Sequence, residues 1–278
     1  ALDSPAAAER AAEAGADTVV DPVAGHFALT TMRACTPEGA DAPALVMFTS
    51  GTTGRPKGVM LGHRAILYQA ASQVLARRIT AADALYIVAP LSHTIGLGSN
   101  LITAGISGAE ALLVPRFDPD ALAHAIAAGR ITFIVAVPQV YTKLLDHAEV
   151  KGIPVGRGRL RVTAAGGAPV DLTLKARMQA TFGLPFGNGY GMTEMTPIAR
   201  VPDDMEASGD EIGIPAPGCD LRVMREDGTE TAPGEIGELW ARGPSRMDGY
   251  FRDPEATAEA LTPEGWLRTG DLARRDAD

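Results

Sequence analysis

The chain has 278 residues, of which 46% are hydrophobic and 21% are charged, a balance typical of a globular protein that buries a core. Its 34 Asp and Glu residues outnumber 25 Lys and Arg, and the formal net charge of −9 argues against general binding of nucleic acid or of an anionic membrane surface. The apolar run at 131–137 is far shorter than the about 20 residues that cross a bilayer. Two cysteines, Cys35 and Cys219, are too few for a disulfide framework and fit a reducing, cytoplasmic location.

From Pro43 onward, short apolar runs rich in β-branched residues alternate with segments of helical length. Nearly continuous apolar strands separated by helices indicate an α/β fold, with a mostly parallel sheet covered by helices on both faces. In such a sheet, ligands bind beyond the carboxyl ends of the strands. We predict strands at 45–49, 85–89, 111–114, 131–137 and 160–165, and helices at 5–14, 63–78, 119–128, 139–148 and 170–182.

After about residue 202, glycine and proline interrupt much shorter strands, predicted at 221–224 and 236–241. Asp227-Gly228 predicts a hairpin turn, because glycine readily adopts the positive φ that such a turn requires. We therefore predict two parts, an α/β core over 1–201 and a smaller β-rich subdomain over 202–278.

The strand at 45–49 runs directly into a segment, 49–58, that has the composition of a polyphosphate-binding loop. Glycines allow the backbone to approach a ligand closely, hydroxyls donate hydrogen bonds, and one lysine supplies positive charge. Pro56 stands before that lysine where the Walker loop has glycine, so this is a different kind of phosphate loop. The residues concerned are Thr49, Ser50, Gly51, Thr52, Thr53, Gly54 and Lys57.

Two other kinds of site lack the spacing that they need. Gly187, Gly189 and Gly191 follow one another at intervals of two, which does not match the Gly-x-Gly-x-x-Gly fingerprint of dinucleotide binding. His26 and His124 have no histidine or carboxylate at the separation typical of zinc ligands. We predict neither NAD nor zinc.

Four segments of the chain resemble signature motifs of the adenylate-forming superfamily and occur in the same order as in that family. The superfamily comprises acyl-CoA synthetases, amino-acid adenylation domains and firefly-type luciferases. Residues 49–58 match the family's Thr-Ser-Gly-(Ser/Thr)-Thr-Gly-x-Pro-Lys-Gly loop, and the other three are Gly-Tyr-Gly-Met-Thr-Glu at 189–194, Gly-Glu-Leu-Trp-Ala-Arg-Gly at 237–243 and Gly-Trp-Leu-Arg-Thr-Gly-Asp at 265–271. Members of the superfamily are about twice as long. The resemblance therefore implies a truncated large domain, without the mobile C-terminal domain that carries the adenylation lysine.

The resemblance also implies a role for each residue of these motifs. The 49–54 loop and Lys57 would bind the phosphates of ATP, Glu194 would hold Mg²⁺, and Thr193 would donate to the α-phosphate. Asp271 would bind the ribose hydroxyls, and His93 would lie beside the reacting carboxylate. Adenine would stack on Tyr190 and lie against Gly191, Met192, Gly166, Gly167, Ala168 and Pro169.

The implied reaction is that of an AMP-forming acyl-CoA synthetase, with ATP, Mg²⁺, coenzyme A and a small carboxylic acid as its ligands. A carboxylate is already a nucleophile at neutral pH, so its activation needs orientation and countercharge and no general base. An amino-acid or aryl-acid adenylation domain, a luciferase-like oxygenase and a nucleotide-binding fragment without turnover remain alternatives. Residues 92–100 contain no carboxylate to hold a substrate ammonium, which disfavours amino acids. The oligomeric state stays open.

The acid itself is predicted from the residues that would line an acyl tunnel. By the resemblance, the tunnel passes His93 and Gly96 and continues toward Met192 and Pro197, positions that are mostly small or apolar. Because an unpaired buried charge is costly, we predict a neutral, hydrophobic tail. Gly96, Gly98 and Ser99 would leave room for length, which favours a medium or long aliphatic acid and a place in fatty acid metabolism.

Overall fold

The computed structural model describes residues 19–21, 26–28, 43–49, 56–202 and 211–277. The chain divides into two compact units, Ala1–Ala42 and Pro43–Asp278. In the first unit, β1 (Val19–Asp21) pairs antiparallel with β2 (His26–Ala28). The helix predicted at 5–14 lies outside the described residues. All elements below belong to the second unit.

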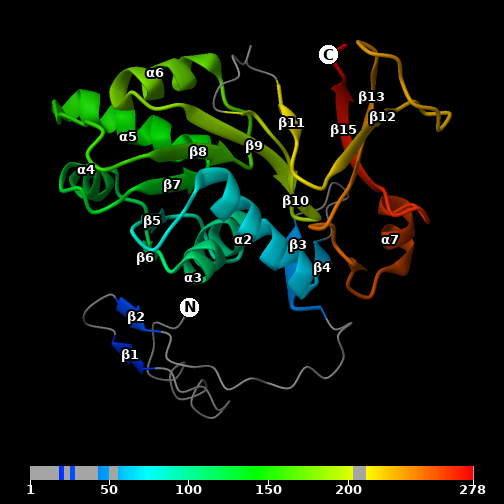
Figure 1. The fold of residues 1–278 in the computed structure, drawn as a ribbon, viewed down its shortest axis with the longest axis horizontal. Coiled ribbons are helices and arrows are strands. Elements are labelled where there is room, and N and C mark those ends of the chain that lie inside the picture. Colours follow the sequence, from blue (N-terminus) through cyan, green and yellow to red (C-terminus); the bar gives the residue numbers. More distant parts are fainter. Residues whose placement is uncertain (1–18, 22–25, 29–42, 50–55, 203–210, 278) are drawn as a thin grey trace. The chain divides into compact units, whose positions relative to one another are not determined.

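A seven-stranded sheet forms the centre of the second unit (Figure 1). The five strands β5 to β9 pair parallel with one another. Strands β10 and β11 pair antiparallel and extend the sheet beyond β9. The α/β class with a largely parallel sheet is therefore confirmed. In spatial order the strands are β11 (Ile214–Pro215), β10 (Met195–Arg200), β9 (Phe186–Met192), β8 (Val162–Gly166), β7 (Phe133–Ala136), β5 (Ala84–Ile87) and β6 (Glu110–Leu113).

Helices cover both faces of this sheet, as the sequence predicts. Because side chains alternate along a strand, neighbouring residues point to opposite faces. Tyr86 and Ile134 pack on the face of α4 to α6, whereas Leu85 and Phe133 pack on the face of η1 and α3. The first set comprises α4 (Pro119–Ala127), α5 (Pro138–Lys151) and α6 (Leu172–Phe182), and the second comprises the π-helix η1 (Ile95–Ile102), α3 (Thr103–Ser107) and α2 (His63–Arg77) beside them.

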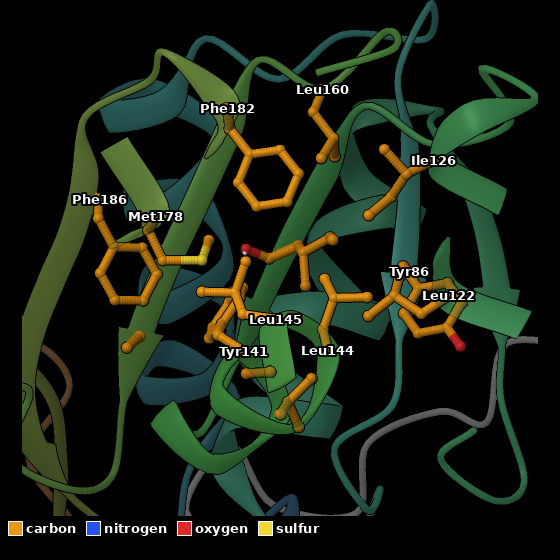
Figure 2. Close-up of a cluster of buried hydrophobic side chains, with 14 of the residues drawn as sticks. Tyr86, Leu122, Ile126, Tyr141, Leu144, Leu145, Leu160, Met178, Phe182 and Phe186 are labelled. Carbon is orange, nitrogen blue, oxygen red and sulfur yellow. Dashed lines mark hydrogen bonds between the residues drawn. The ribbon is translucent and has the colours of Figure 1, made fainter. Parts of the chain in front are cut away.

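The larger cluster of buried apolar side chains lies between the sheet and helices α4 to α6 (Figure 2). Tyr141 at its centre is fully buried, and its hydroxyl donates to the carbonyls of Ile134 and Ala164 at 2.9 and 2.6 Å. Its ring meets Phe186 edge to face with centroids 4.8 Å apart. One side chain of α5 thus connects three neighbouring strands and fixes the helix on the sheet.

The strand predicted at 45–49 is confirmed, but it does not belong to the parallel sheet. β3 (Leu45–Thr49) pairs antiparallel with β4 (Lys57–Leu61), and β4 pairs with β14 (Gly249–Tyr250) in a separate three-stranded sheet. Only seven residues separate β3 from β4, whereas a parallel pair needs a crossover of about a dozen or more. The short connection therefore makes a hairpin.

A third antiparallel sheet, of order β12-β13-β15, follows the seven-stranded one in the chain. Its strands are β12 (Asp220–Met224), β13 (Ile236–Arg242) and β15 (Leu267–Arg274). The turn predicted at Asp227-Gly228 is present: Gly228 has φ 81°, and the Arg225 N–H donates to the carbonyl of Thr229 at 2.8 Å.

Three helical elements among the described residues escape the sequence prediction: α7, η1 and α3, which follows η1 directly. α7 (Pro254–Ala260) begins at Asp253, whose carboxylate accepts from the Ala256 N–H at 3.0 Å, a capping signal that the sequence does carry. η1 carries no comparable signal, because its glycines predict loop. The predicted boundary at residue 201 remains a prediction; Met195 and Leu267 pack in one buried cluster across it.

Candidate active site

An open cavity of about 1150 Å³ lies at the carboxyl ends of β5, β7 and β8. Strand β6 lies next to β5 on one side, and the following strand β7 lies next to β5 on its other side. The direction in which strands are added to the sheet therefore reverses between β5 and β7. Such a reversal leaves a crevice where ligands bind in open α/β sheets. Ala89, His93 and Val137, which follow the two strands, line the cavity.

The two ends of the predicted phosphate loop face this cavity. Thr49 and Lys57 are paired across the β3–β4 hairpin, and both side chains line the cavity. The residues between them that carry predicted contacts, Ser50, Gly51, Thr52, Thr53 and Gly54, lie outside the described residues. The structure therefore places the loop's entry, its exit and its lysine at the cavity.

Thr193 and Glu194 form the turn that joins β9 to β10, between the paired Met192 and Met195. Both line the cavity, although Glu194 is only 7% exposed. Its Oε1 accepts from the Tyr250 hydroxyl at 2.8 Å, and its carbonyl accepts from the Met247 N–H at 2.7 Å. Its second carboxylate oxygen, Oε2, has no hydrogen-bond donor among the described side chains, so it is available to a ligand.

Tyr250 also contacts the lysine of the phosphate loop. Lys57 Nζ lies 4.9 Å from the centre of the Tyr250 ring, within the range of a cation–π contact. Burial, followed by the neighbouring Glu194 carboxylate, raises the pKa of Tyr250 well above its usual range. The hydroxyl therefore stays protonated and donates to Glu194.

The residues suit Mg²⁺ only together with a phosphate ligand. No group of three or more His, Cys, Asp or Glu side chains is arranged for a metal within the described part of the chain. Mg²⁺ is commonly held by one or two carboxylates, substrate phosphates and water, and Glu194 supplies one such carboxylate beside the predicted phosphate loop.

Asp271 reaches the cavity because β15 bulges. Glu238 pairs with Leu272 and Trp240 pairs with Arg268, so two steps along β13 oppose four along β15. The surplus residues Thr269, Gly270 and Asp271 bulge out within β15, with Gly270 at φ 76°, and this bend, termed the Asp271 turn, brings Asp271 to the cavity. A bulge of this kind commonly redirects a side chain next to a functional site.

Tyr190, on β9, donates its hydroxyl to the Asp271 carboxylate. Burial, followed by this hydrogen bond, raises the pKa of Tyr190. Gly191 and Met192 continue along the same cavity wall. The predicted adenine and ribose residues are therefore brought together from two distant segments of the chain.

The predicted adenine-edge loop follows β8 directly. Gly166 and Gly167 line the cavity, while Ala168 and Pro169 follow them toward α6 and do not line it. Gly167 has φ +76°, and a Cβ there would lie 3.0 Å from the Ile95 side chain, so glycine is required.

His93 is exposed and lines the cavity, as predicted for a residue near the reacting carboxylate. The glycines after it do not provide room for a long tail. A Cβ on Gly96 would come within 2.2 Å of the Pro90 carbonyl, and one on Gly98 within 2.2 Å of the Gln69 side chain. These glycines allow η1 to pack closely against its neighbours, whereas Ser99 does line the cavity; the long aliphatic acid remains a prediction.

Two residues of the site, Tyr250 and Glu238, have no role in the sequence prediction, although Glu238 belongs to the motif quoted at 237–243. Tyr250 bridges Glu194 and Lys57, and Glu238 accepts hydrogen bonds from the turn that carries Asp271. Both line the cavity. Nothing in the sequence alone shows which partners these two side chains meet.

Residues 2–251 match the AMP-binding enzyme family, and the chain belongs to this family. No helix in the described part of the chain is long and apolar enough to cross a membrane.

The chain is similar to curated proteins and to solved structures of acid–CoA ligases. It is 35% identical to feruloyl-CoA synthase of Amycolatopsis sp. over 87% of this chain and 49% of that protein. It is 34% identical to indoleacetate–CoA ligase of Aromatoleum aromaticum over 86% of this chain and 47% of that protein. The structure of O-succinylbenzoate coenzyme A synthetase from Bacillus subtilis, in complex with ATP and magnesium ion, superposes with a TM-score of 0.77 at 33% identity, covering 86% of this chain and 49% of that one. The chain thus spans about half the length of these relatives.

Proposed function

We propose that the chain is the nucleotide- and acid-binding part of an AMP-forming acid–CoA ligase that uses ATP, Mg²⁺ and coenzyme A. One observation carries the proposal. Lys57, Glu194 and Asp271, from three separate motifs, line a single cavity at the strand reversal, together with the phosphate-loop ends and Tyr190. Binding of ATP requires a cation that meets the phosphates, a carboxylate that holds the metal and an acceptor for the ribose diol, and these three residues supply them.

The first half-reaction forms an acyl-adenylate. A carboxylate oxygen of the acid attacks the α-phosphorus of ATP, the bond to the bridging oxygen of the β-phosphate breaks, and pyrophosphate leaves with that electron pair. Lys57 places positive charge at the phosphates and Thr193 offers a hydroxyl donor to the α-phosphate. Mg²⁺, when held by Glu194 and the phosphates, supplies further positive charge as charge shifts onto the leaving group.

The second half-reaction transfers the acyl group. The thiol sulfur of coenzyme A forms a bond to the acyl carbon, AMP leaves with the electrons of the acyl–oxygen bond, and the thiol proton passes to solvent. Because the cavity is open at one side, the adenylate ester remains accessible to a second substrate. His93, exposed at the cavity wall, is proposed to lie beside the reacting carboxyl group.

For the acid, we propose a neutral, hydrophobic tail. Apolar side chains line the cavity together with His93, among them Ile95, Val135 and Val137, and Gln73 and Arg77 are the polar lining residues from α2. The close packing at Gly96 and Gly98 favours a compact tail over a long aliphatic one. Relatives named for ferulic and indoleacetic acids support an aromatic tail, and the aliphatic alternative is resolved by the experiment below.

Binding of non-hydrolysable acyl-adenylate analogues tests both parts of the proposal without requiring turnover. Calorimetry on the purified chain compares AMP with acyl sulfamate analogues that carry an aryl, a long aliphatic, an aminoacyl or a dicarboxylate tail. We expect the aryl analogue to bind most tightly, at least tenfold better than AMP. Tightest binding of the aminoacyl or dicarboxylate analogue would contradict the neutral tail, and equal binding of all analogues and AMP would support a nucleotide-binding function alone.

The acyl acceptor is tested separately, in the protein at its natural length. The protein is incubated with ATP, Mg²⁺, the preferred acid and coenzyme A, and the thioester is measured by mass spectrometry. A luciferase-like reaction would instead consume oxygen and emit light. Accumulation of acyl-adenylate without any thioester would contradict the assignment of coenzyme A as the acceptor.

A further inference from the structure

We propose that Glu238 is a positioning residue that holds the turn carrying Asp271 in the geometry needed to bind the ribose of the nucleotide. The inference rests on the proposed function, because it assumes that Asp271 meets the ribose. Glu238 itself stands on β13, at the edge of the bulge, and lines the same cavity.

Both oxygens of the Glu238 carboxylate are used. Oε1 accepts from the Gly270 N–H, the residue immediately before Asp271, at 3.1 Å. Oε2 accepts from Trp240 Nε1 at 2.8 Å. One hydrogen bond therefore fixes the turn to the carboxylate, and the other fixes the carboxylate to its own strand.

The partners of Glu238 are themselves anchored. The guanidinium of Arg268 lies 5.1 Å from the centre of the Trp240 ring, which restrains the indole. On the other side of the turn, the Thr269 hydroxyl donates to the Leu239 carbonyl at 2.7 Å and accepts from the Asp271 N–H at 3.1 Å. Thr269, Gly270 and Asp271 are thus each held by a side chain or backbone group of β13 or of the turn itself.

This arrangement matters because Glu238 holds the backbone at Gly270, whereas the Tyr190 hydroxyl holds only the side chain of Asp271. Asp271 is exposed, and Gly270 is the residue whose backbone is least restricted sterically. A carboxylate that must meet two ribose hydroxyls at once loses affinity when its backbone is free to move, since ordering it then opposes binding. Preorganisation by Glu238 avoids that loss.

The test is a combination of protein and ligand substitutions, measured by calorimetry. Glu238→Gln keeps the shape and one acceptor but presents an N–H where the second acceptor stands, so one of the two hydrogen bonds is lost. We expect AMP to bind Glu238→Gln about fivefold to tenfold more weakly than the unaltered chain. For 2′-deoxy- and 3′-deoxy-AMP, each of which keeps only one ribose hydroxyl for Asp271, we expect the substitution to weaken binding by a clearly smaller factor than for AMP.

The deoxynucleotides separate positioning from charge. Removing the negative charge of Glu238 would alter the affinity of every nucleotide monophosphate alike, whereas a loss of Asp271 positioning acts only through the ribose hydroxyls. Glu226→Gln, on the exposed turn after β12, is the matched control and should change nothing. Thermal unfolding of each variant shows that it is folded before binding is compared.

The possible results lead to distinct conclusions. If the unaltered chain binds AMP and both deoxynucleotides equally, Asp271 does not read the ribose and the proposed nucleotide geometry fails. If the unaltered chain discriminates and Glu238→Gln retains the same discrimination, the positioning role of Glu238 is refuted. If the substitution weakens all three ligands equally, the effect is electrostatic and the inference is again refuted.

Discussion

At the scale of single residues, Tyr250 connects the carboxylate proposed to hold Mg²⁺ with the lysine of the phosphate loop. Its hydroxyl donates to Glu194, and its ring lies beneath Lys57 Nζ. A hydrogen bond to one carboxylate oxygen orients the other, and residues that orient a metal ligand affect metal affinity. Glu194 therefore depends on a neighbour that reaches it only through tertiary structure.

Tyr250→Phe removes this hydrogen bond and keeps the ring under Lys57. We expect the affinity for ATP in the presence of Mg²⁺ to fall by about tenfold, as for loss of a hydrogen bond to a charged group, and the affinity in EDTA to change little. Calorimetry in the two buffers measures the difference. Tyr86→Phe is the control, because its hydroxyl is buried without a partner among the described residues. An equal loss in both buffers would refute a role through the metal.

Asp271 provides the second prediction at this scale. Asp271→Ala removes the proposed diol acceptor and the acceptor of the Tyr190 hydroxyl, and should weaken AMP binding by about 1.5–3 kcal/mol. Asp276→Ala, also exposed near the end of the chain, serves as the control. Calorimetry compares the two, and unchanged affinity of Asp271→Ala would remove this residue from the site.

At the scale of elements, an ion pair with a buried carboxylate, Asp83–Arg161, ties the starts of three strands together at the end of the sheet opposite the cavity. Asp83 lies just before β5, Thr132 just before β7 and Arg161 just before β8. The Asp83 carboxylate accepts from Arg161 Nε at 2.7 Å and from the Thr132 hydroxyl at 2.7 Å. Burial opposes ionisation of Asp83, which is 5% exposed, but hydrogen bonds from Arg161, Thr132 and Thr80 outweigh it. They lower the pKa of Asp83 from 3.8 to about 2.

This pair predicts a pH dependence of stability. Because the pKa is lower in the folded chain, the stabilisation is present above about pH 4 and is lost as the pH falls toward 2. Asp83→Asn should lower the free energy of unfolding by on the order of 2 kcal/mol at pH 7 and by much less near pH 2. Urea unfolding at both pH values tests this, with Asp276→Asn as the control. An equal loss at both values would show that the charge of Asp83 is not responsible.

At the scale of the whole molecule, the cavity is assembled from residues between Thr49 and Asp271, so the ligand and the fold are coupled. A ligand that binds only the folded chain stabilises it, by about 2.7 kcal/mol at a concentration one hundred times its dissociation constant. We expect Mg²⁺ and ATP to raise the midpoint of thermal unfolding together, and Asp271→Ala to reduce that rise. A rise of the same size with GTP would contradict specific recognition of adenine.

Much of the fold and of the site was predictable from sequence, because both depend on local patterns. Apolar runs such as 131–137 mark strands buried on both faces, and the capping and glycine signals mark the turns that the structure contains. Lys57 was identified by the residue types of its loop, and Glu194 and Asp271 by the resemblance of their motifs to a known family; all three line one cavity. Local sequence thus determined most helices and strands of the α/β core, their order and the chemical groups of the site.

Only the tertiary structure decided how those groups meet. The pairing of β4 with β14, the π-helix η1 and the bulge of β15 depend on which distant segments meet and in what register, and these are long-range properties. The same applies to Tyr250 on Glu194 and to Glu238 on Gly270, contacts between residues 56 and 32 positions apart. The glycines of η1 look alike in sequence whether they open a tunnel or close a packing contact. Neighbouring backbone and side chains, distant along the chain, make them a packing contact here.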